Sequence, residues 1–444
     1  MQNTDFEKKV LALADKLKDK TIEWRRNFHK HPESGWTEFR TAALVADALT
    51  EWGYEVSTGD AVIKEDAMMG VPSKEELSEH EKRALAQNAN PHWVEKMKGG
   101  KTGVVGILRG AKPGAVVALR FDMDCNEVIE TTDPNHLPNK FGFASINAGY
   151  MHACGHDSHI AMGLTLAEIL AQLKDELCGT VKLIFQPAEE GGRGSKAMVA
   201  AGVADDVDFM LCTHVGFKAD KTGGFCCNVY GFLANSRYDA IFTGAPTHAG
   251  ATPERGKNAL LAAACAALNM HAIPRHSEGA SRINVGVLNA GSSRNVLPAN
   301  AIMKFETRGA TSTINDYMSS EATRILNAAA QMYDVGLKIK IAGSAPSASN
   351  SPELAAKIEA LAERLALFET IMPKSIFGAS DDFTSFMERV QQNNKQAAYL
   401  MIGSNLAGKH HEVDFDFDES VLDGGLKLLA VLTTELMAEQ PAAK

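Results

Sequence analysis

Short apolar runs alternate with helix-type patterns through the first half of the 444-residue chain. The apolar runs are residues 103–108, 115–121, 181–185 and 208–212. Between the second and the third run, apolar residues recur at helical spacing, at Leu164, Ala167, Leu170 and Leu173. Because strands that alternate with helices pack as a sheet covered by those helices, the pattern predicts an α/β fold.

Two segments before these runs differ from the alternating pattern. Residues 22–52 have the pattern of an amphipathic helix on both sides of a turn at the sequence HPESG. Residues 55–100 are polar, and we expect an irregular insertion on the surface there.

A later segment has another order of elements. Within residues 235–344 the patterns are a strand, a helix, two strands, a helix and a strand, which is the order of a ferredoxin-like domain. Such a unit can fold as an inserted domain. We therefore predict a mixed-sheet main domain formed by residues 1–234 and 345–444, interrupted by a ferredoxin-like (βαββαβ) domain of residues 235–344.

Composition argues against several classes of protein. The chain has 45 Lys and Arg against 55 Asp and Glu, and this net charge of -10 argues against a nucleic-acid binder and against docking to anionic lipid. It has no run of 18 apolar residues, and its charged N-terminus is unlike a signal peptide. Seven cysteines, an odd number, do not suggest a disulfide framework. We expect a soluble, cytoplasmic protein with reduced thiols and with neither a nucleic-acid nor a membrane partner.

Polar side chains follow three of the predicted strands. Asp122 and Asp124 follow the second run, Glu189 and Glu190 follow the third, and His214 follows the fourth. Open α/β sheets build their ligand sites at the carboxyl ends of strands. Each residue alone has an ordinary explanation, as a surface carboxylate, a turn cap or a structural histidine. Their joint placement at one sheet edge predicts a functional site.

The sequence MHACGHDSH lies between these strands, just before the predicted helix. Cys154 and His156 stand two residues apart on this glycine-containing loop, so a thiolate and an imidazole can face one ion. Cysteine, histidine and carboxylate are ligand types that zinc and manganese-like ions accept. The sequence thus predicts a metal site at this sheet edge.

These motifs resemble a known family. RRNFHKHPESGWTEFRTA, DMD, MHACGHDSH, FQPAEEG, THAGATPERGKNAL and RNVLPANA are similar, in this order, to motifs of the metallo-aminoacylase and carboxypeptidase superfamily. The resemblance covers essentially the whole chain. It points to the amidohydrolase branch, and the sequences FASINAGYMHACGHD and AGKHHEVDFDFDE are most similar to the p-aminobenzoyl-glutamate hydrolase subgroup.

The resemblance implies two divalent metal ions per chain, Mn²⁺ or Zn²⁺, with the cysteine bridging them. The implied ligands are Cys154, His156, Glu190, His214 and His411. The family places its last ligand histidine four residues before a phenylalanine, here Phe415, which favours His411 over the neighbouring His410.

The resemblance also implies other roles. Glu189 corresponds to the general base, and Asp124 stands where the superfamily places an acid that orients a group of the metal site. His248, Asn295 and Arg308 match positions of a lid and dimerisation domain that bind the scissile carbonyl and the substrate carboxylate, often across a dimer.

Two motif positions remain without a chemical role. Many relatives have Pro-His after the THA motif, whereas Pro253 is followed here by Glu254, so a role for that second position is in doubt. His29 and His31 belong to a shared motif, and we interpret them as structural.

The predicted reaction is metal-dependent hydrolysis of an N-acyl or N-aroyl amino acid, with p-aminobenzoyl-glutamate as the implied substrate. The resemblance also implies a homodimer or a heteromer with a related B subunit. Three alternatives remain open. The first is a cysteine hydrolase with Cys154 as nucleophile. The second is a binding protein, or a non-catalytic or weakly active subunit of a heteromeric hydrolase, that keeps the fold, and the third is a hydrolase of indoleacetyl-amino acids or hippurate.

Overall fold

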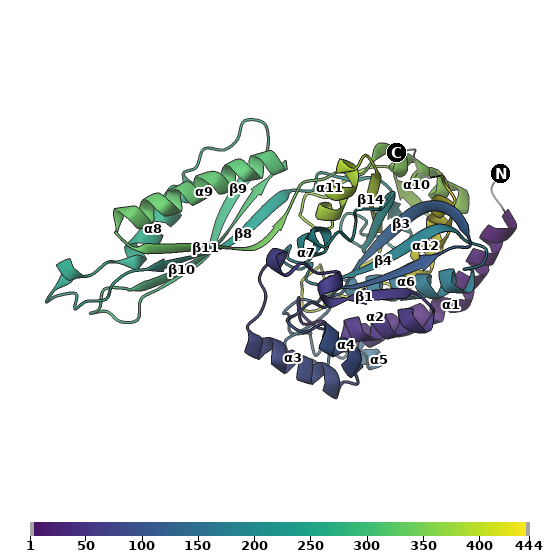
Figure 1. The fold of residues 1–444 in the computed structure, drawn as a ribbon, viewed down its shortest axis with the longest axis horizontal. Coiled ribbons are helices and arrows are strands. Elements are labelled where there is room, and N and C mark those ends of the chain that lie inside the picture. Colours follow the sequence, from purple (N-terminus) through teal and green to yellow (C-terminus); the bar gives the residue numbers. More distant parts are fainter. Residues whose placement is uncertain (1–3, 441–444) are drawn as a thin grey trace. The chain divides into compact units, whose positions relative to one another are not determined.

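The structure is a computed structural model that describes residues 4–440 and divides into two compact units (Figure 1). Unit 1 runs to Tyr230 and also includes Ser349–Phe377 and the chain from Ser385 onward. Unit 2 consists of Gly231–Ala348 and Gly378–Thr384. No helix in the described part of the chain is long and apolar enough to cross a bilayer.

Unit 1 is built on an eight-stranded mixed sheet. In spatial order its strands are β1 (Glu55–Thr58), β2 (Val104–Arg109), β4 (Cys178–Gln186), β3 (Lys112–Asp122), β5 (Phe209–Val215), β14 (Gln396–Ile402), β6 (Gly224–Cys226) and β12 (Thr370–Met372). The four central strands β4, β3, β5 and β14 are parallel, and β1, β2 and β6 run antiparallel to their inner neighbours. Two short strands, β7 (Val229–Tyr230) and β13 (Ser375–Ile376), pair separately. The predicted mixed α/β fold is confirmed.

Helices pack on this sheet. The longer ones are α1 (Thr4–Lys30), α2 (Phe39–Glu51), α6 (His156–Gln172), α10 (Pro352–Leu365) and α12 (Val421–Met437). Helices α6 and α12 both contact β3 and β4, and α1 packs on α6 and α12. Nearly every residue of α6 is buried, because sheet and helices surround it. The start of α6, where the candidate ligand loop ends, is therefore held firmly.

The polar segment 55–100 is more regular than its composition suggested, and the expectation of an irregular insertion was wrong. It contains β1, two single 3₁₀ turns (η1, Gly59–Ala61; η2, Glu65–Ala67) and the helices α3 (Lys74–Ala86) and α4 (Pro91–Lys96). Ser73 caps α3, and Asn90 with Pro91 begins α4, so capping residues mark both helices. Buried Leu77 and Trp93 then anchor them to the core.

The first helix, α1, also begins much earlier than residue 22, where the sequence pattern placed its start. The remaining short helices of unit 1 are α5 (Leu137–Phe141), α7 (Ser195–Ala200) and α11 (Thr384–Gln392), whose first residue is counted with unit 2.

Unit 2 has the βαββαβ order of a ferredoxin-like domain. Its elements are β8 (Ala234–Thr243), η3 (Pro253–Arg255), α8 (Ala259–His271), β9 (Ser281–Ala290), β10 (Asn300–Gly309), α9 (Ser312–Met332) and β11 (Gly336–Ala345). The sheet is antiparallel in the order β11-β8-β10-β9. Along β10 the buried Met303 and Phe305 join the core with α8 and α9, whereas Ile302 and Lys304, which alternate with them, are exposed. The second face of this sheet is therefore open, and we call it the open face.

Candidate metal and catalytic site

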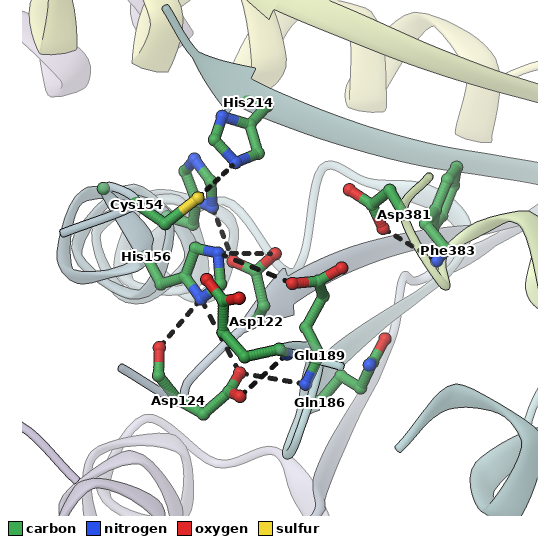
Figure 2. A network of polar contacts seen from close by, with 12 residues as sticks. Asp122, Asp124, Cys154, His156, Gln186, Glu189, His214, Asp381 and Phe383 are labelled. Atoms are coloured by element: carbon green, nitrogen blue, oxygen red, sulfur yellow. Dashed lines mark hydrogen bonds and ion pairs between the residues drawn. The ribbon is translucent and has the colours of Figure 1, made fainter. Parts of the chain in front are cut away.

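The carboxyl ends of three adjacent parallel strands bring the candidate residues together. Asp122 is the last residue of β3, β4 ends just before Glu189, and His214 lies near the end of β5. Because parallel strands end at the same edge of a sheet, these side chains converge there with Cys154 and His156. Figure 2 shows Asp122, Cys154, His156, Glu189 and His214 pointing toward one another.

The loop before α6 presents the thiol and the first imidazole. Gly155 adopts a left-handed conformation, with φ of 87°, which a side chain would strain. This turn lets Cys154 and His156 face the same space on either side of the glycine. The ligand-type atoms of Cys154, His156 and His214 lie within 4.8 Å of one another, and the Cys154 Sγ to His214 Nε2 distance is 3.6 Å.

Backbone carbonyl groups orient both histidines. His156 donates from Nδ1 to the Asp124 carbonyl at 2.8 Å, and His214 donates from Nδ1 to the Val215 carbonyl at 2.9 Å. A histidine that donates from one ring nitrogen presents the other as a lone pair, which is how metal-ligating histidines are held. Among residues 4–440, the buried Nε2 atom of His156 has no hydrogen-bond partner. A cation in this space would satisfy it.

Two buried carboxyl groups, one of them the Asp124 carboxylate in Figure 2, hold the turn that bears Glu189 and Glu190. The Asp124 carboxylate accepts the N–H groups of both glutamates, at 2.9 Å each. The Glu38 carboxyl accepts the N–H of Ala188 at 2.8 Å, and Ala188 has a positive φ of 52°. Such a strained residue persists only where its surroundings hold it, and here those surroundings aim the two glutamate side chains at the site.

Glu38 was not predicted as part of the site. It lies within the motif HPESGWTEFRTA, and that motif was the one sequence signal that pointed to it. Burial, with a further contribution from the negative charge of Asp124, raises the pKa of Glu38 to about 8. Glu38 is therefore mainly protonated at neutral pH, which avoids two adjacent buried anions.

His410 and His411 have different surroundings. The Nε2 atom of His411 lies 3.2 Å from Glu190 Oε1, and the ligand-type atoms of Cys154, Glu190 and His411 lie within 4.8 Å of one another. His410 instead donates to the Val215 carbonyl at 3.1 Å, and its ring stacks on Phe217. Burial lowers the pKa of His410 to about 4. Of the two histidines, His411 is the one beside Glu190.

The electrostatics of the cluster suit a cation. Burial, reinforced by the charge of Glu190, raises the pKa of the Cys154 thiol well above its ordinary value. Without a cation the thiol stays protonated, whereas a bound divalent ion would favour the thiolate. Burial disfavours a charged His156, but the carboxylate of Asp122 outweighs this and raises its pKa. Thiol, imidazole and carboxylate around one buried space are thus a donor set that fits a divalent metal.

Asp122 and His159 form a supporting layer behind this cluster. Asp122 is paired with Arg120, and His159 donates from Nδ1 to the Asp122 carboxylate at 2.5 Å. The second ring nitrogen of His159 accepts the N–H of Val215 at 3.3 Å. Both nitrogens of His159 are therefore engaged by protein groups.

The three candidate residues of unit 2 do not converge within that unit. His248 lies in the loop after β8, next to the Asn295 loop, because the N–H of Ala249 donates to the Asn295 carbonyl at 2.9 Å. Arg308 lies at the far end of β10, and at ~3.3 Å per residue the strand separates it from Asn300 by about 26 Å. One small substrate cannot reach both ends.

A protein-family model, peptidase family M20/M25/M40, matches residues 118–435. The A subunit of p-aminobenzoyl-glutamate hydrolase from Escherichia coli (strain K12) is 48% identical over 95% of this chain and 96% of that protein. The indole-3-acetyl-aspartic acid hydrolase of Enterobacter agglomerans is 45% identical over 92% of this chain and 94% of that protein. The solved structure of an aminobenzoyl-glutamate utilization protein from Klebsiella pneumoniae aligns with a TM-score of 0.82 and 38% identity, covering 98% of both chains. The chain therefore belongs to peptidase family M20/M25/M40 and is a metal-dependent amidohydrolase of the carboxypeptidase type.

Proposed function

We propose that this chain hydrolyses the amide bond of an N-aroyl amino acid, with p-aminobenzoyl-glutamate as substrate and p-aminobenzoate and glutamate as products. The observation that carries the proposal is the buried cluster of thiol, imidazoles and carboxylates with Glu189 at its edge. The 48% identity to the Escherichia coli p-aminobenzoyl-glutamate hydrolase chain supports this substrate.

In this proposal the residues of the cluster hold two divalent ions. Cys154, His156, Glu190, His214 and His411 would hold these ions. Zn²⁺ and Mn²⁺ both suit this set. When bound, such ions lower the pKa of water toward about 7 and polarise a carbonyl group.

Glu189 acts as the general base. It takes a proton from the attacking water and returns it to the leaving amine, which is the work of a group that can exist in both protonation states. The Glu189 carboxylate supports this role because its Oε2 lies 4.0 Å from Nε2 of His156, close to the ligands without being buried among them. Asp124 is a positioning residue, since it holds the backbone of both glutamates.

Unit 2 supplies the groups that bind the substrate. His248 donates a hydrogen bond to the oxyanion, Asn295 assists it, and Arg308 binds the free carboxylate. Because His248 and Arg308 lie at opposite ends of unit 2, we propose that a complete site takes them from two different chains. The second chain is another copy or a related B subunit, since the name of the Escherichia coli relative implies a second component.

A substrate panel tests the proposal. The purified chain, with and without added Mn²⁺ or Zn²⁺, is assayed on p-aminobenzoyl-glutamate, indole-3-acetyl-aspartate and hippurate. We expect metal-dependent cleavage, fastest for p-aminobenzoyl-glutamate. Faster cleavage of indole-3-acetyl-aspartate would mean that the substrate carries an indole-3-acetyl group, as in the name of the second relative. Full activity after thorough chelation would favour the cysteine hydrolase instead.

A further inference from the structure

Unit 2 contains a cavity of about 330 Å³ at the Arg308 end of its sheet. We call it the arginine pocket and define it by Arg275, Ser281, Arg282, Asn284, Glu306 and Arg308. We propose that the arginine pocket binds both carboxylates of an acidic amino acid, so that the enzyme selects N-acyl conjugates of glutamate or aspartate. This inference rests on the proposed function and deepens it, since only Arg308 had a role there.

Strand register places two arginines face to face. Arg282 on β9 is the direct partner of Arg308 on β10. Arg308 alternates with the buried Thr307, so it belongs to the open face, and direct cross-strand partners project from the same face. Their Cβ atoms are then ~5 Å apart, and two like charges at that spacing destabilise a sheet. A pair that repels in the free protein is suited to an anion that lies between the two side chains.

In the described part of the chain, two of the three arginines that line the pocket form no ion pair with a protein carboxylate, so they are available to a bound anion. Arg308 donates from Nε and Nη2 to the two oxygens of Glu306, at 2.8 and 3.2 Å. Arg282 has no ion pair with a carboxylate within residues 4–440, and neither has Arg275, which donates only to the Ile273 carbonyl at 3.3 Å.

The charge of the pocket matches the ligand. Three arginines and one glutamate line it, so its net charge is 3 - 1 = +2. An N-acylated glutamate or aspartate has no amine charge and has two carboxylates, so it carries two negative charges. The planar guanidinium fork fits a carboxylate, and Arg275 and Arg282 together suit the side-chain carboxylate. Arg308 takes the other carboxylate through Nη1, because Glu306 engages its Nε and Nη2. A glycine conjugate such as hippurate would leave Arg275 and Arg282 without a partner.

Kinetic discrimination tests the pocket in the full-length, metal-loaded protein. The measured quantity is kcat/KM for p-aminobenzoyl-glutamate divided by kcat/KM for p-aminobenzoyl-glutamine, its neutral analogue. We expect the protein to favour the glutamate conjugate by at least about tenfold, since a site built for a charged partner rejects an analogue that lacks it. Arg282→Gln should reduce this ratio at least about tenfold, and Arg275→Gln should reduce it in the same direction. The control Lys338→Gln removes an exposed cation from β11, at the opposite edge of the sheet, and should leave the ratio within about twofold.

Equal hydrolysis of both conjugates, or an equal loss in Arg282→Gln and Lys338→Gln, would overturn the inference while the proposed function stands. Calorimetric titration with glutarate, which has two carboxylates and no amide bond, gives a readout without turnover. We expect glutarate to bind more tightly than its monoamide, and Arg282→Gln to abolish the difference. If no conjugate is hydrolysed but this difference is seen, the pocket stands and the proposed function fails. If no difference is seen, the pocket does not bind a dicarboxylate.

Discussion

The charge of His29 should make unit 1 lose stability at alkaline pH. His29 is fully buried in α1, with Nδ1 2.8 Å from Asp157 Oδ2 and Nε2 3.0 Å from Glu130 Oε1. Burial opposes its protonation, but the hydrogen bonds to the two carboxylates outweigh burial and raise the pKa of His29 to about 9. The imidazolium thus ties α1 to the first turn of α6 and to the segment around residue 130.

The expected magnitude follows from the pKa. A rise from 6.5 to about 9 corresponds to roughly 3 kcal/mol, at about 1.4 kcal/mol for each pKa unit. Because the folded-state pKa lies above the unfolded value, this stabilisation is complete below pH 6.5 and is lost as pH rises through 9. Between pH 7 and pH 10 the free energy of unfolding should fall by about 2 to 3 kcal/mol through His29 alone. In His29→Gln this part of the pH dependence should be absent.

The assay is urea unfolding followed by tryptophan fluorescence. All four tryptophans, Trp24, Trp36, Trp52 and Trp93, lie in unit 1, so the signal reports that unit. Excess chelator removes the pH dependence of metal binding. His31→Gln is the matched control, because His31 is partly exposed and its Nδ1 contacts the Asn27 carbonyl, which is a neutral partner. An equal fall between pH 7 and pH 10 in the wild type and in His29→Gln would refute a charged His29.

Three further predictions concern the site. Cys154→Ala or His156→Ala should lose at least one of up to two divalent ions per chain, measured by elemental analysis. Unchanged metal content in both variants would mean that Cys154 and His156 are not metal ligands. Glu189→Gln should keep its metal and lose at least a hundredfold in kcat, as expected for a general base. If this variant instead keeps its turnover and loses metal, Glu189 is the metal ligand and Glu190 is the general base. Mixing His248→Ala with Glu189→Gln chains should restore part of the activity, because a mixed dimer has one intact composite site; no recovery despite verified exchange of chains would mean that His248 acts within its own chain or not at all.

Much of the fold was accessible from local sequence. The four predicted runs correspond to β2, β3, β4 and β5, and the structure extends or shifts their ends by one to three residues. These strands are apolar because helices or neighbouring strands cover them, which makes them visible in the sequence. The segment 55–100 was not visible in this way. Its helices α3 and α4 are short and polar, and they are stabilised by caps and by a few buried anchors such as Trp93.

The sequence by itself determined which chemical groups stand at the strand ends: carboxylates after β3 and β4, an imidazole in β5, and a thiol and an imidazole around Gly155. Only the tertiary structure decided how they are held and which neighbours matter. Glu38 lies 150 residues from Ala188, whose N–H it accepts, and no local pattern encodes a contact over that separation. Local spacing likewise does not show that His411 faces Glu190, that Arg282 opposes Arg308, or that His248 and Arg308 lie at opposite ends of one sheet. The periodicity of apolar residues indicates which positions are buried, and the residue types indicate which chemical groups are present. Whether those groups come together in one site depends on strand register and on turns that distant parts of the chain hold in place.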